Sequence, residues 1–266
     1  MKCINKEGDV HNERVDRKRV SSMKIKSKII RRIMIDIISL IVISLFLVLW
    51  QTTVTAGQED QLQKALLDTE RLVYYALEDN TAYLLVSTTD QMAYGDLLLV
   101  LNRGEGGVWK RSYENEFTGL KPWKLVLADV DGDGEQEILT AVRKTTFYDK
   151  EEKNRLFIFN YINGKLVKKW TGSDIAGSWE DFVSGELVDT KGEEIIFITK
   201  TKEGSEKLFV YHWFDFGFLM LAQSGDYEDI IEVGILKENR INITYIDGQK
   251  KRELLQLVGG RVSKVN

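Results

Sequence analysis

The sequence predicts an all-β, propeller-like array of about four antiparallel four-stranded units, preceded by one N-terminal transmembrane helix. Recurring strand-turn-strand patterns after residue 71 predict the β units, and a single apolar stretch behind a basic leader predicts the helix. These signals divide the chain into a basic cytoplasmic tail (1–32), a signal-anchor helix (33–50), a linker with a short helix (51–70) and an extracytoplasmic β domain (71–266).

An internal repeat is the main evidence for the β architecture. Four segments consist of an apolar strand, a turn rich in Gly or Asn, and a second alternating strand; they begin at Leu98, Leu156, Leu208 and Leu254. Another candidate strand pair precedes each of them, beginning at Leu72, Trp123, Trp179 and Ile230. Four strands repeated at about fifty residues are typical of a propeller blade. An antiparallel meander or a sandwich would also alternate strands and turns.

Residues 33–50 are apolar apart from Asp36, Ser39 and Ser44. At 1.5 Å per residue, a helix of this length spans about 27 Å, close to the thickness of a bilayer core. Five Lys and Arg residues lie just before it at 24–32, and residues 51–57 carry no charge. This asymmetry predicts a single-pass protein of the cell membrane with its C-terminal domain outside. Cleavage after Ala56, a small-residue site, would instead release a secreted domain.

The balance of charged residues also changes after the predicted membrane segment. Residues 1–56 hold 11 basic and 5 acidic residues, whereas the remainder holds 26 basic and 36 acidic ones. An acidic domain argues against nucleic acid as a partner, because phosphate binding needs clustered Lys and Arg. The single cysteine, Cys3, lies in the leader, so no disulfide within the chain stabilises the fold. Translation can begin at Met1 or at Met23, which opens a typical leader.

One motif carries chemistry. Acidic side chains alternate along residues 129–137 at Asp129, Asp131, Asp133, Glu135 and Glu137, with glycines at 132 and 134. Calcium takes six to eight oxygen ligands, and carboxylates at alternate positions of a tight loop can converge on one ion. The three aspartates and Glu137 would supply side-chain oxygens, and Glu135 its backbone carbonyl. An acidic turn without metal is the alternative.

An EF-hand matches the start of this motif but not its end. Its loop needs a bidentate acid at position twelve, which here is Thr140. The flanking segments also have the pattern of strands. The motif instead resembles the calcium loops of FG-GAP and VCBS repeats, the blades of integrin-α-type propellers, which follow D-x-D-x-D-G-x-x-D/E between two strands. The resemblance implies a calcium-binding propeller, although such propellers carry six or seven blades and four are counted here.

The third repeat contains a degenerate form of the same loop at residues 186–194. Glu186 and Glu194 stand where Asp129 and Glu137 do, but Val188 and Thr190 replace the two middle aspartates. We therefore expect this second loop to bind no ion.

The sequence leaves three classes of function open. The first is a membrane-anchored, calcium-stabilised module that binds a protein or polysaccharide at the cell surface. The second is a cell-wall-acting enzyme with an acid pair among Asp174, Glu180 and Asp181, and the third is a structural assembly component. No G-x-S-x-G, H-E-x-x-H or Walker motif occurs. His212 lies in an apolar strand, as a structural residue would. We therefore expect a protein that is not an enzyme, with Trp213 and Phe214 as a candidate contact patch.

Overall fold

The computed structural model describes residues 57–90, 93–172, 174–189, 191–236 and 238–265. The chain divides into one unit that ends at Gln61 and a second compact unit, Leu62–Asn266, which contains every described strand. A helix covers residues 57–63. Within the described ranges, no helix has the length and apolar character needed to span a bilayer. The predicted membrane segment 33–50 and the cleavage point after Ala56 lie outside them.

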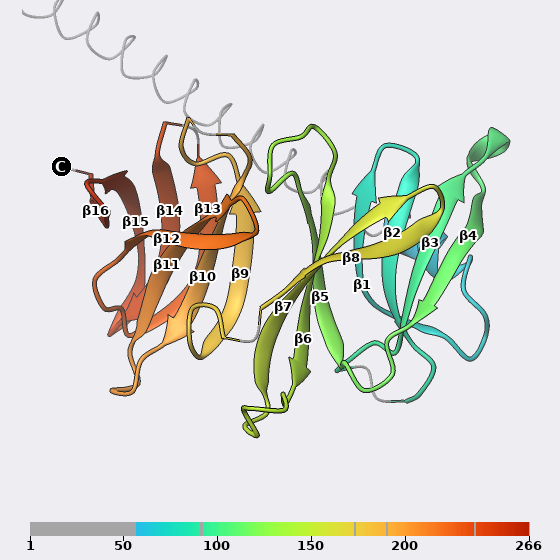
Figure 1. Cartoon of the computed structure of the whole chain (residues 1–266), viewed down its shortest axis with the longest axis horizontal. Helices are drawn as coiled ribbons and strands as arrows, with labels where there is room; N and C mark the ends of the chain where they lie inside the picture. The colour runs from blue at the N-terminus through green and yellow to red at the C-terminus, as the bar shows by residue number, and fades with distance from the viewer. Residues whose placement is uncertain (1–56, 91–92, 173, 190, 237, 266) are drawn as a thin grey trace, which may run out of the picture. The chain divides into compact units, whose positions relative to one another are not determined.

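The described residues of the second unit form sixteen strands in three sheets (Figure 1). The first sheet contains β1 (Arg71–Glu78), β2 (Thr81–Ser87), β3 (Leu97–Arg103) and β4 (Trp109–Glu116), with a 3-10 turn at Glu105–Gly107. The second contains β5 (Pro122–Ala128), β6 (Glu137–Lys144), β7 (Lys153–Ile162) and β8 (Lys165–Thr171). The third contains β9 (Trp179–Gly185), β10 (Glu194–Lys200), β11 (Glu206–Phe214), β12 (Gly217–Gln223), β13 (Asp229–Leu236), β14 (Arg240–Asp247), β15 (Gln249–Val258) and β16 (Arg261–Lys264).

The prediction of a mostly β domain is confirmed, with sheets of four, four and eight strands. Consecutive strands pair antiparallel within β1–β4, β5–β8, β9–β12 and β13–β16. The last two groups join in one sheet because β12 and β16 pair in parallel at a single position, Gln223 opposite Arg261.

Burial explains the sequence of the second strand in each of the first three groups. β2, β6 and β10 are buried along six consecutive residues each, on both faces. A strand covered on both sides needs a continuous apolar run rather than alternation. The outermost strand β4 instead alternates half-buried and exposed residues along its whole length, as a strand with one solvated face does.

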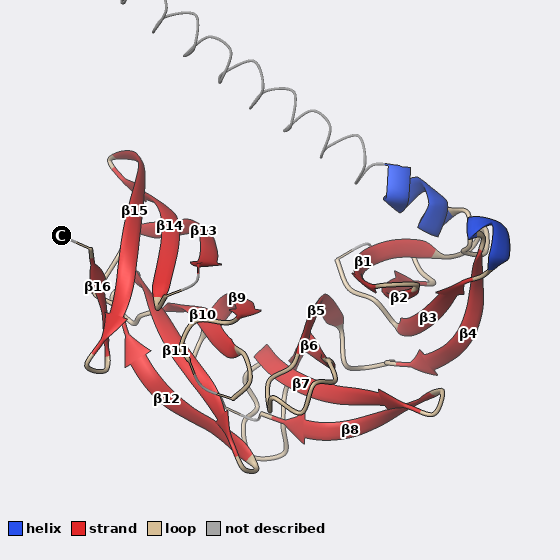
Figure 2. Cartoon of the chain, turned by 90° about the horizontal axis from the view of Figure 1, so that it is seen from above, coloured by secondary structure: helices blue, strands red, loops and turns tan. Residues whose placement is uncertain are grey.

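Neighbouring sheets pack face to face through aromatic and aliphatic side chains. The first strand of each group lies against the first strand of the next, in the series β1, β5, β9, β13 (Figure 2). Phe117 stacks on Phe159 at 5.4 Å between the first and second sheets. Trp123 meets the fully buried Trp179 at 6.3 Å between the second and third. Each interface is therefore a separate core shared by two sheets.

Two loops at corresponding ends of neighbouring sheets touch through their backbones. The Glu193 N–H donates to the Asp129 carbonyl at 2.8 Å. Gly192 has φ +92°, and a Cβ there would lie 2.3 Å from the Val130 carbonyl oxygen. The β9–β10 loop can therefore approach the β5–β6 loop only with glycine at this position.

We predict that Gly192→Ala destabilises the domain more than Gly134→Ala. Gly134 has a similar φ of +95° but nothing within 4 Å of an added methyl group, so its substitution reports the backbone cost alone. That cost is about 1–2 kcal/mol, and the steric overlap at residue 192 adds about 1–3 kcal/mol. Urea unfolding of both variants measures the difference; equal losses would show that the two loops do not constrain one another.

Candidate functional site

The β5–β6 loop is held by its own carboxylates. Both oxygens of Asp129 accept backbone hydrogen bonds, from the N–H of Asp133 at 3.1 Å and of Gly134 at 3.0 Å. Asp133 Oδ1 accepts the N–H of Glu135 at 2.9 Å. Aspartate side chains stabilise tight turns in this way, because their oxygens accept hydrogen bonds from N–H groups of the turn that have no backbone carbonyl as a partner.

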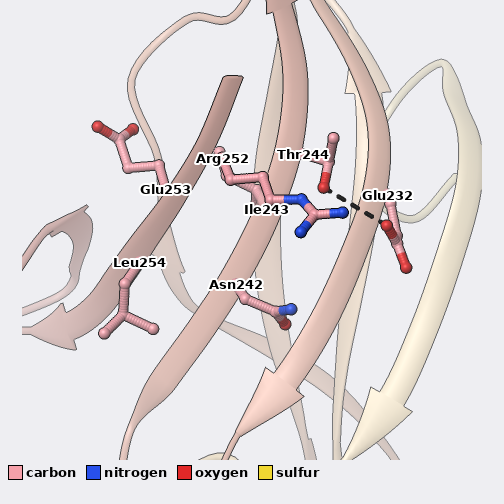
Figure 3. A pocket seen from close by; sticks show the side chains of 7 residues that line it. All are labelled: Glu232, Asn242, Ile243, Thr244, Arg252, Glu253 and Leu254. Carbon is pink, nitrogen blue, oxygen red and sulfur yellow. Dashed lines mark hydrogen bonds between the residues drawn. The ribbon is translucent and has the colours of Figure 1, made fainter. Parts of the chain in front are cut away.

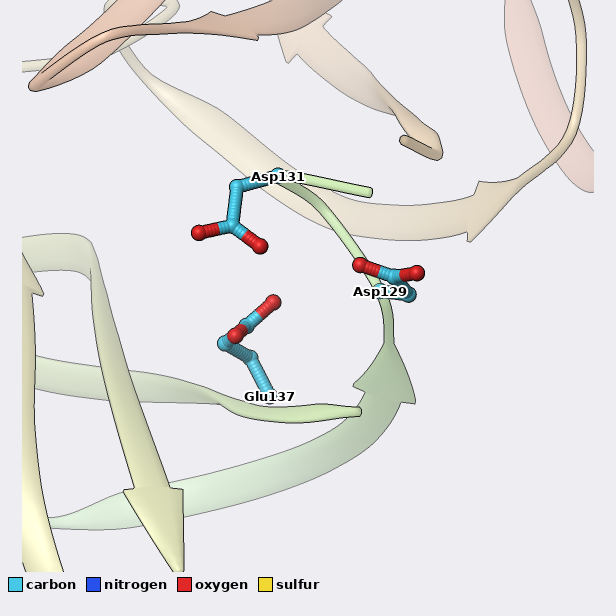
Figure 4. A group of neighbouring side chains, drawn as sticks. All are labelled: Asp129, Asp131 and Glu137. Carbon is cyan, nitrogen blue, oxygen red and sulfur yellow. The ribbon is translucent and has the colours of Figure 1, made fainter. Parts of the chain in front are cut away.

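Three of the five predicted ligands come together in this loop. Asp129, Asp131 and Glu137 each place a carboxylate oxygen within 4.8 Å of the others. The carboxylates of Asp131 and Glu137 point toward one another, with Asp129 beside them at the end of β5 (Figure 4). Asp133 and Glu135 are exposed and lie outside this group. The predicted roles of these two residues would require the loop to rearrange.

Glu137 is the buried centre of the cluster. It is fully buried at the start of β6 and is bound from three directions. Glu137 Oε2 accepts the Val130 N–H at 3.0 Å, and Oε1 accepts from Asn160 Nδ2 at 2.9 Å and from Lys169 Nζ at 2.7 Å. Burial raises the pKa of this carboxyl, and the Lys169 ammonium and the Val130 N–H offset only part of that rise.

Lys169, which the sequence analysis did not identify, bridges two of the carboxylates. Its Nζ lies 2.5 Å from Asp131 Oδ2 and 2.7 Å from Glu137 Oε1, with 16% of the side chain exposed. Burial lowers the pKa of the ammonium, but its hydrogen bonds to Asp131 and Glu137 outweigh burial and the net shift is upward. The ammonium also lies 5.6 Å from the centroid of the Trp213 ring, within range of a cation–π contact.

The third group of strands repeats this arrangement with a leucine in place of the lysine, and His212 Nδ1 lies 3.3 Å from the buried carboxylate of Glu194. Glu194 is fully buried at the start of β10, and its Oε2 accepts the N–H groups of Leu187 and Val188. Lys169 occupies the extra position of the bulge in β8, where the strand pairing skips one residue. Leu221 occupies the same position in β12 and joins the same apolar cluster as Val188. An acid–lysine pair in one repeat is thus an apolar pair in the next.

This comparison shows the signal that could have revealed Lys169. When the repeats beginning at Leu156 and Leu208 are aligned residue by residue, Lys169 falls on Leu221 and, in the preceding loops, Asp131 falls on Val188. One repeat therefore has an acidic and a basic residue, Asp131 and Lys169, at the two positions where the next repeat has the aliphatic residues Val188 and Leu221. Because the two positions change together, they are expected to be in contact.

The donor set fits a hard cation. Carboxylate oxygens are the ligands that calcium prefers. Asp131 Oδ1 is buried and has no hydrogen-bond partner among the described residues, although a buried polar atom normally has one. Asp129, Asp131 and Glu137 could therefore hold a cation if the Lys169 ammonium moved away from them.

The other acidic candidates do not form a pair. Asp181 Oδ1 binds Lys124 Nζ at 2.6 Å. Asp174 lies 3.5 Å from Lys153, and Glu180 lies 3.5 Å from Lys200. Three carboxylates with three different lysine partners do not present the shared, unpaired arrangement that acid–base catalysis uses.

The aromatic residues at the β11–β12 turn are partly exposed. Trp213 packs against the core between the second and third sheets, whereas Phe214 is 60% and Phe216 is 83% exposed. The predicted contact patch thus includes Phe214 but not the whole of Trp213.

Two depressions lie elsewhere on the described surface. One, of about 440 Å³, lies on the sheet face of β13–β15, where Arg252 extends toward Thr244 and Glu232 (Figure 3). Thr244 Oγ1 donates to Glu232 Oε2 there at 3.4 Å. The other, of about 320 Å³, is a cleft lined by Ala93, Tyr94, Trp123, Arg143, Asn154 and Glu180.

Comparison with known proteins finds likeness only at the level of structure. No protein-family model matches the chain, and no curated protein matches it. A putative 6-phosphogluconolactonase from Bacteroides uniformis superposes with a TM-score of 0.51 at 10% identity, over 74% of this chain and 54% of that one. This chain therefore spans about half the length of that protein, and the likeness shows a shared β fold.

Two further solved structures are more distant. A protein related to a Xanthomonas type IV secretion system matches with a TM-score of 0.31 at 14% identity, over 76% of this chain and 95% of that one. A putative 6-phosphogluconolactonase from Bacteroides fragilis matches with a TM-score of 0.34 at 11% identity, over 73% of each chain.

The expectation that this protein is not an enzyme is wrong as drawn. It rested on the absence of familiar nucleophile, metal-hydrolase and nucleotide motifs. The fold is shared with a putative lactonase, so it is a fold on which an enzyme can be built. A site on such a scaffold is assembled from loops of several strands, and short sequence motifs do not report it.

We predict that Lys169→Met destabilises the domain by about 3 kcal/mol near pH 8, the low end of the range for loss of one partner from a buried ion pair. Without the ammonium, the pKa of buried Glu137 rises further above its usual 4.5. A carboxyl with a raised folded-state pKa stabilises the fold when protonated and loses that contribution as pH rises through the folded-state pKa. The loss should therefore shrink as pH falls toward 5.

Urea unfolding at pH 5 and pH 8 measures this effect. Lys168→Met is the matched control, because Lys168 is the exposed neighbour on the same strand, and its effect should be within about 0.5 kcal/mol at both pH values. A loss for Lys169→Met that is independent of pH would contradict the assignment of Lys169 as the counter-ion of Glu137.

Proposed function

We propose that this chain is a membrane-anchored, extracytoplasmic calcium-binding protein of propeller-like β repeats that acts as a binding module at the cell surface. The observation that carries the proposal is the convergence of Asp129, Asp131 and Glu137, within 4.8 Å, in a loop between two strands. The resemblance of residues 129–137 to FG-GAP and VCBS loops supports it, as do four consecutive groups of four antiparallel strands.

In this proposal the loop alternates between two counter-ions. In the calcium-free form, the Lys169 ammonium compensates Asp131 and Glu137. In the loaded form, the three carboxylates hold the cation and Lys169 withdraws toward Trp213, whose ring already lies 5.6 Å from Nζ. A divalent ion compensates three clustered carboxylates more fully than one ammonium does, because its charge is double and its ligands are closer.

A bound cation would also limit movement between the second and third groups of strands. The β5–β6 loop contacts the β9–β10 loop through the Glu193 N–H and Asp129 carbonyl. A cation bound at Asp129 therefore restrains two neighbouring groups of strands. This would keep the surfaces at their junction in one arrangement when a partner binds.

We predict that millimolar calcium raises the melting temperature of the whole chain in detergent, whereas the same concentration of magnesium has little effect. Ligand binding to the native state stabilises it by RT ln(1 + [L]/Kd), about 2.7 kcal/mol at a hundredfold excess over Kd. Asp131→Ala should abolish the calcium response, and Lys169→Met should enlarge it because the competing ammonium is gone. Differential scanning calorimetry with calcium, magnesium and chelator measures all three.

The control for this experiment is Asp189→Ala, which removes an exposed carboxylate from the degenerate β9–β10 loop. This variant should keep the calcium response of the wild type. Identical melting curves of wild-type protein in calcium and in chelator would leave residues 129–137 as an acidic turn without metal.

We also predict that protease added to intact spheroplasts digests residues 57–266 and spares the basic N-terminal segment. The reason is the excess of Lys and Arg before the apolar residues 33–50. Immunoblotting with tags at the two ends of the chain reports which end is cleaved. Protection of the C-terminal tag in spheroplasts, with digestion after lysis, would place the β domain inside the cell and end this part of the proposal.

A further inference from the structure

A cleft away from the acidic loop carries a second inference. It lies where three sheets meet, and it is lined by residues of the loop before β3, of β5, β6 and β7, and of β9. Its volume of about 320 Å³ is at the lower end of the range for small-molecule sites. We propose that this cleft binds a neutral saccharide through Tyr94, Trp123, Arg143, Asn154 and Glu180. The proposal deepens the proposed function, because it names the chemical class that the binding module takes.

The polar edge of Trp123 is fixed by its neighbours. Trp123 Nε1 donates to Asn154 Oδ1 at 3.1 Å, and Asn154 Nδ2 donates to the Trp179 carbonyl at 2.9 Å. These two bonds fix the orientation of both the indole ring and the amide. Trp123 is only half-buried, so part of its surface is available in the cleft. Asn154 keeps one N–H and one lone pair for a ligand.

Tyr94 is also positioned. The Gly95 N–H donates to the Pro122 carbonyl at 2.7 Å, which attaches the loop of Tyr94 to the start of β5. The Lys121 ammonium lies 6.0 Å from the centroid of the Tyr94 ring. Tyr94 and Trp123 thus bring two aromatic side chains to one cleft, and aromatic rings contribute large contact areas at low conformational cost.

The two charged residues that line the cleft, Arg143 and Glu180, make only long ion pairs within the described part of the protein. Arg143 has its nearest acid, Glu152, at 3.8 Å from Nε, and its side chain is 44% exposed. Glu180 lies 3.5 Å from Lys200 and is 54% exposed. The Arg143 guanidinium offers several hydrogen-bond donors, and the Glu180 carboxylate offers only acceptors. A ligand that satisfies both must donate and accept hydrogen bonds.

Charged groups of both signs surround the cleft and favour a neutral ligand. The basic groups are Arg143, Lys121 and Lys200, and the acidic groups are Glu180, 3.5 Å from Lys200, and Glu152, 2.5 Å from Lys121. A strongly anionic ligand would be repelled by the carboxylates and a cationic one by the basic groups. Hydroxyl groups donate and accept at a single atom, and the C–H faces of a sugar ring can lie on aromatic side chains. A neutral saccharide meets all of these conditions together.

A peptide fits the cleft less well. One mode of peptide binding adds a strand to a free sheet edge. β5 and β9 are terminal strands of their sheets, but the cleft takes from them only Trp123 and Glu180, each the second residue of its strand. A strand added along either edge would therefore meet the cleft only at its end. The aromatic residues approach from the ends of strands rather than along one.

The experiment uses the whole chain in detergent with saturating calcium. An array of neutral and acidic glycans is tested first, and chitotetraose, cellotetraose and the best array ligand are then titrated by calorimetry. We expect a neutral glycan to bind with a Kd of about 1 mM or tighter. Arg143→Ala, Glu180→Ala and Trp123→Phe should each weaken binding about tenfold. Tyr148→Ala and Arg252→Ala, which lie outside the cleft, should leave it unchanged.

Several outcomes would overturn the proposal. They are no binding of any neutral glycan, binding that the cleft variants do not weaken, or selective binding of acidic glycans or peptides. The calcium-dependent melting of the same samples separates this failure from that of the proposed function. A normal calcium response without glycan binding rejects the saccharide site alone, whereas the loss of both rejects the module itself. Because the Arg143 and Glu180 side chains are 44% and 54% exposed and their ion pairs are long, their variants should keep the wild-type melting temperature.

Discussion

The buried carboxylate of Glu137 is the constraint on which the second group of strands depends. An ionised carboxylate without solvent is stable only if donors and a counter-ion surround it. The chain supplies a backbone N–H from the preceding loop, an amide from β7 and an ammonium from β8. One side chain at the start of β6 thereby connects the loop with two further strands. Glu194 likewise accepts two backbone N–H groups of its own loop, and His212 Nδ1 lies 3.3 Å from its Oε1.

Strand β5 links the acidic loop to the cleft. Trp123 is its second residue, and Asp129 follows its last, so the two sites lie at opposite ends of one strand. The same strand packs against β1 on one side and β9 on the other. Restraint of the acidic loop therefore restrains the strand whose other end carries Trp123. In this account the cation does not contact the saccharide; it holds the strand that presents part of the saccharide site.

The sequence predicted the features that depend on local pattern. Hairpins beginning near Leu98, Leu156 and Leu208 follow from alternating apolar residues and Gly or Asn turns, and the structure has strands there. Asp129, Asp131 and Glu137 are close in sequence, and a tight turn between two paired strands brings them together. These predictions needed no knowledge of contacts between distant segments.

The features that the sequence did not predict depend on distant contacts. Lys169 lies 32 residues beyond Glu137 in the chain, and only the bulge in β8 aims it at the loop. The single pairing of Gln223 with Arg261 merges two groups of strands into one sheet, and no local pattern marks it. The cleft takes its residues from five segments, so no spacing rule could assemble it. The mistaken expectation about enzymes has the same cause, since it relied on motifs that are local.

The position of the Lys169 ammonium tests the central claim most directly. Its ¹⁵N–¹H signal can be followed by NMR in the whole chain, assigned by comparison with Lys169→Arg, first in chelator and then during a calcium titration. The account predicts a slowly exchanging ammonium in chelator, held by Asp131 and Glu137, that is lost or strongly shifted as calcium binds. A signal that stays unchanged while calcium saturates the protein would show that the ammonium and the cation do not share a site, and would contradict the account.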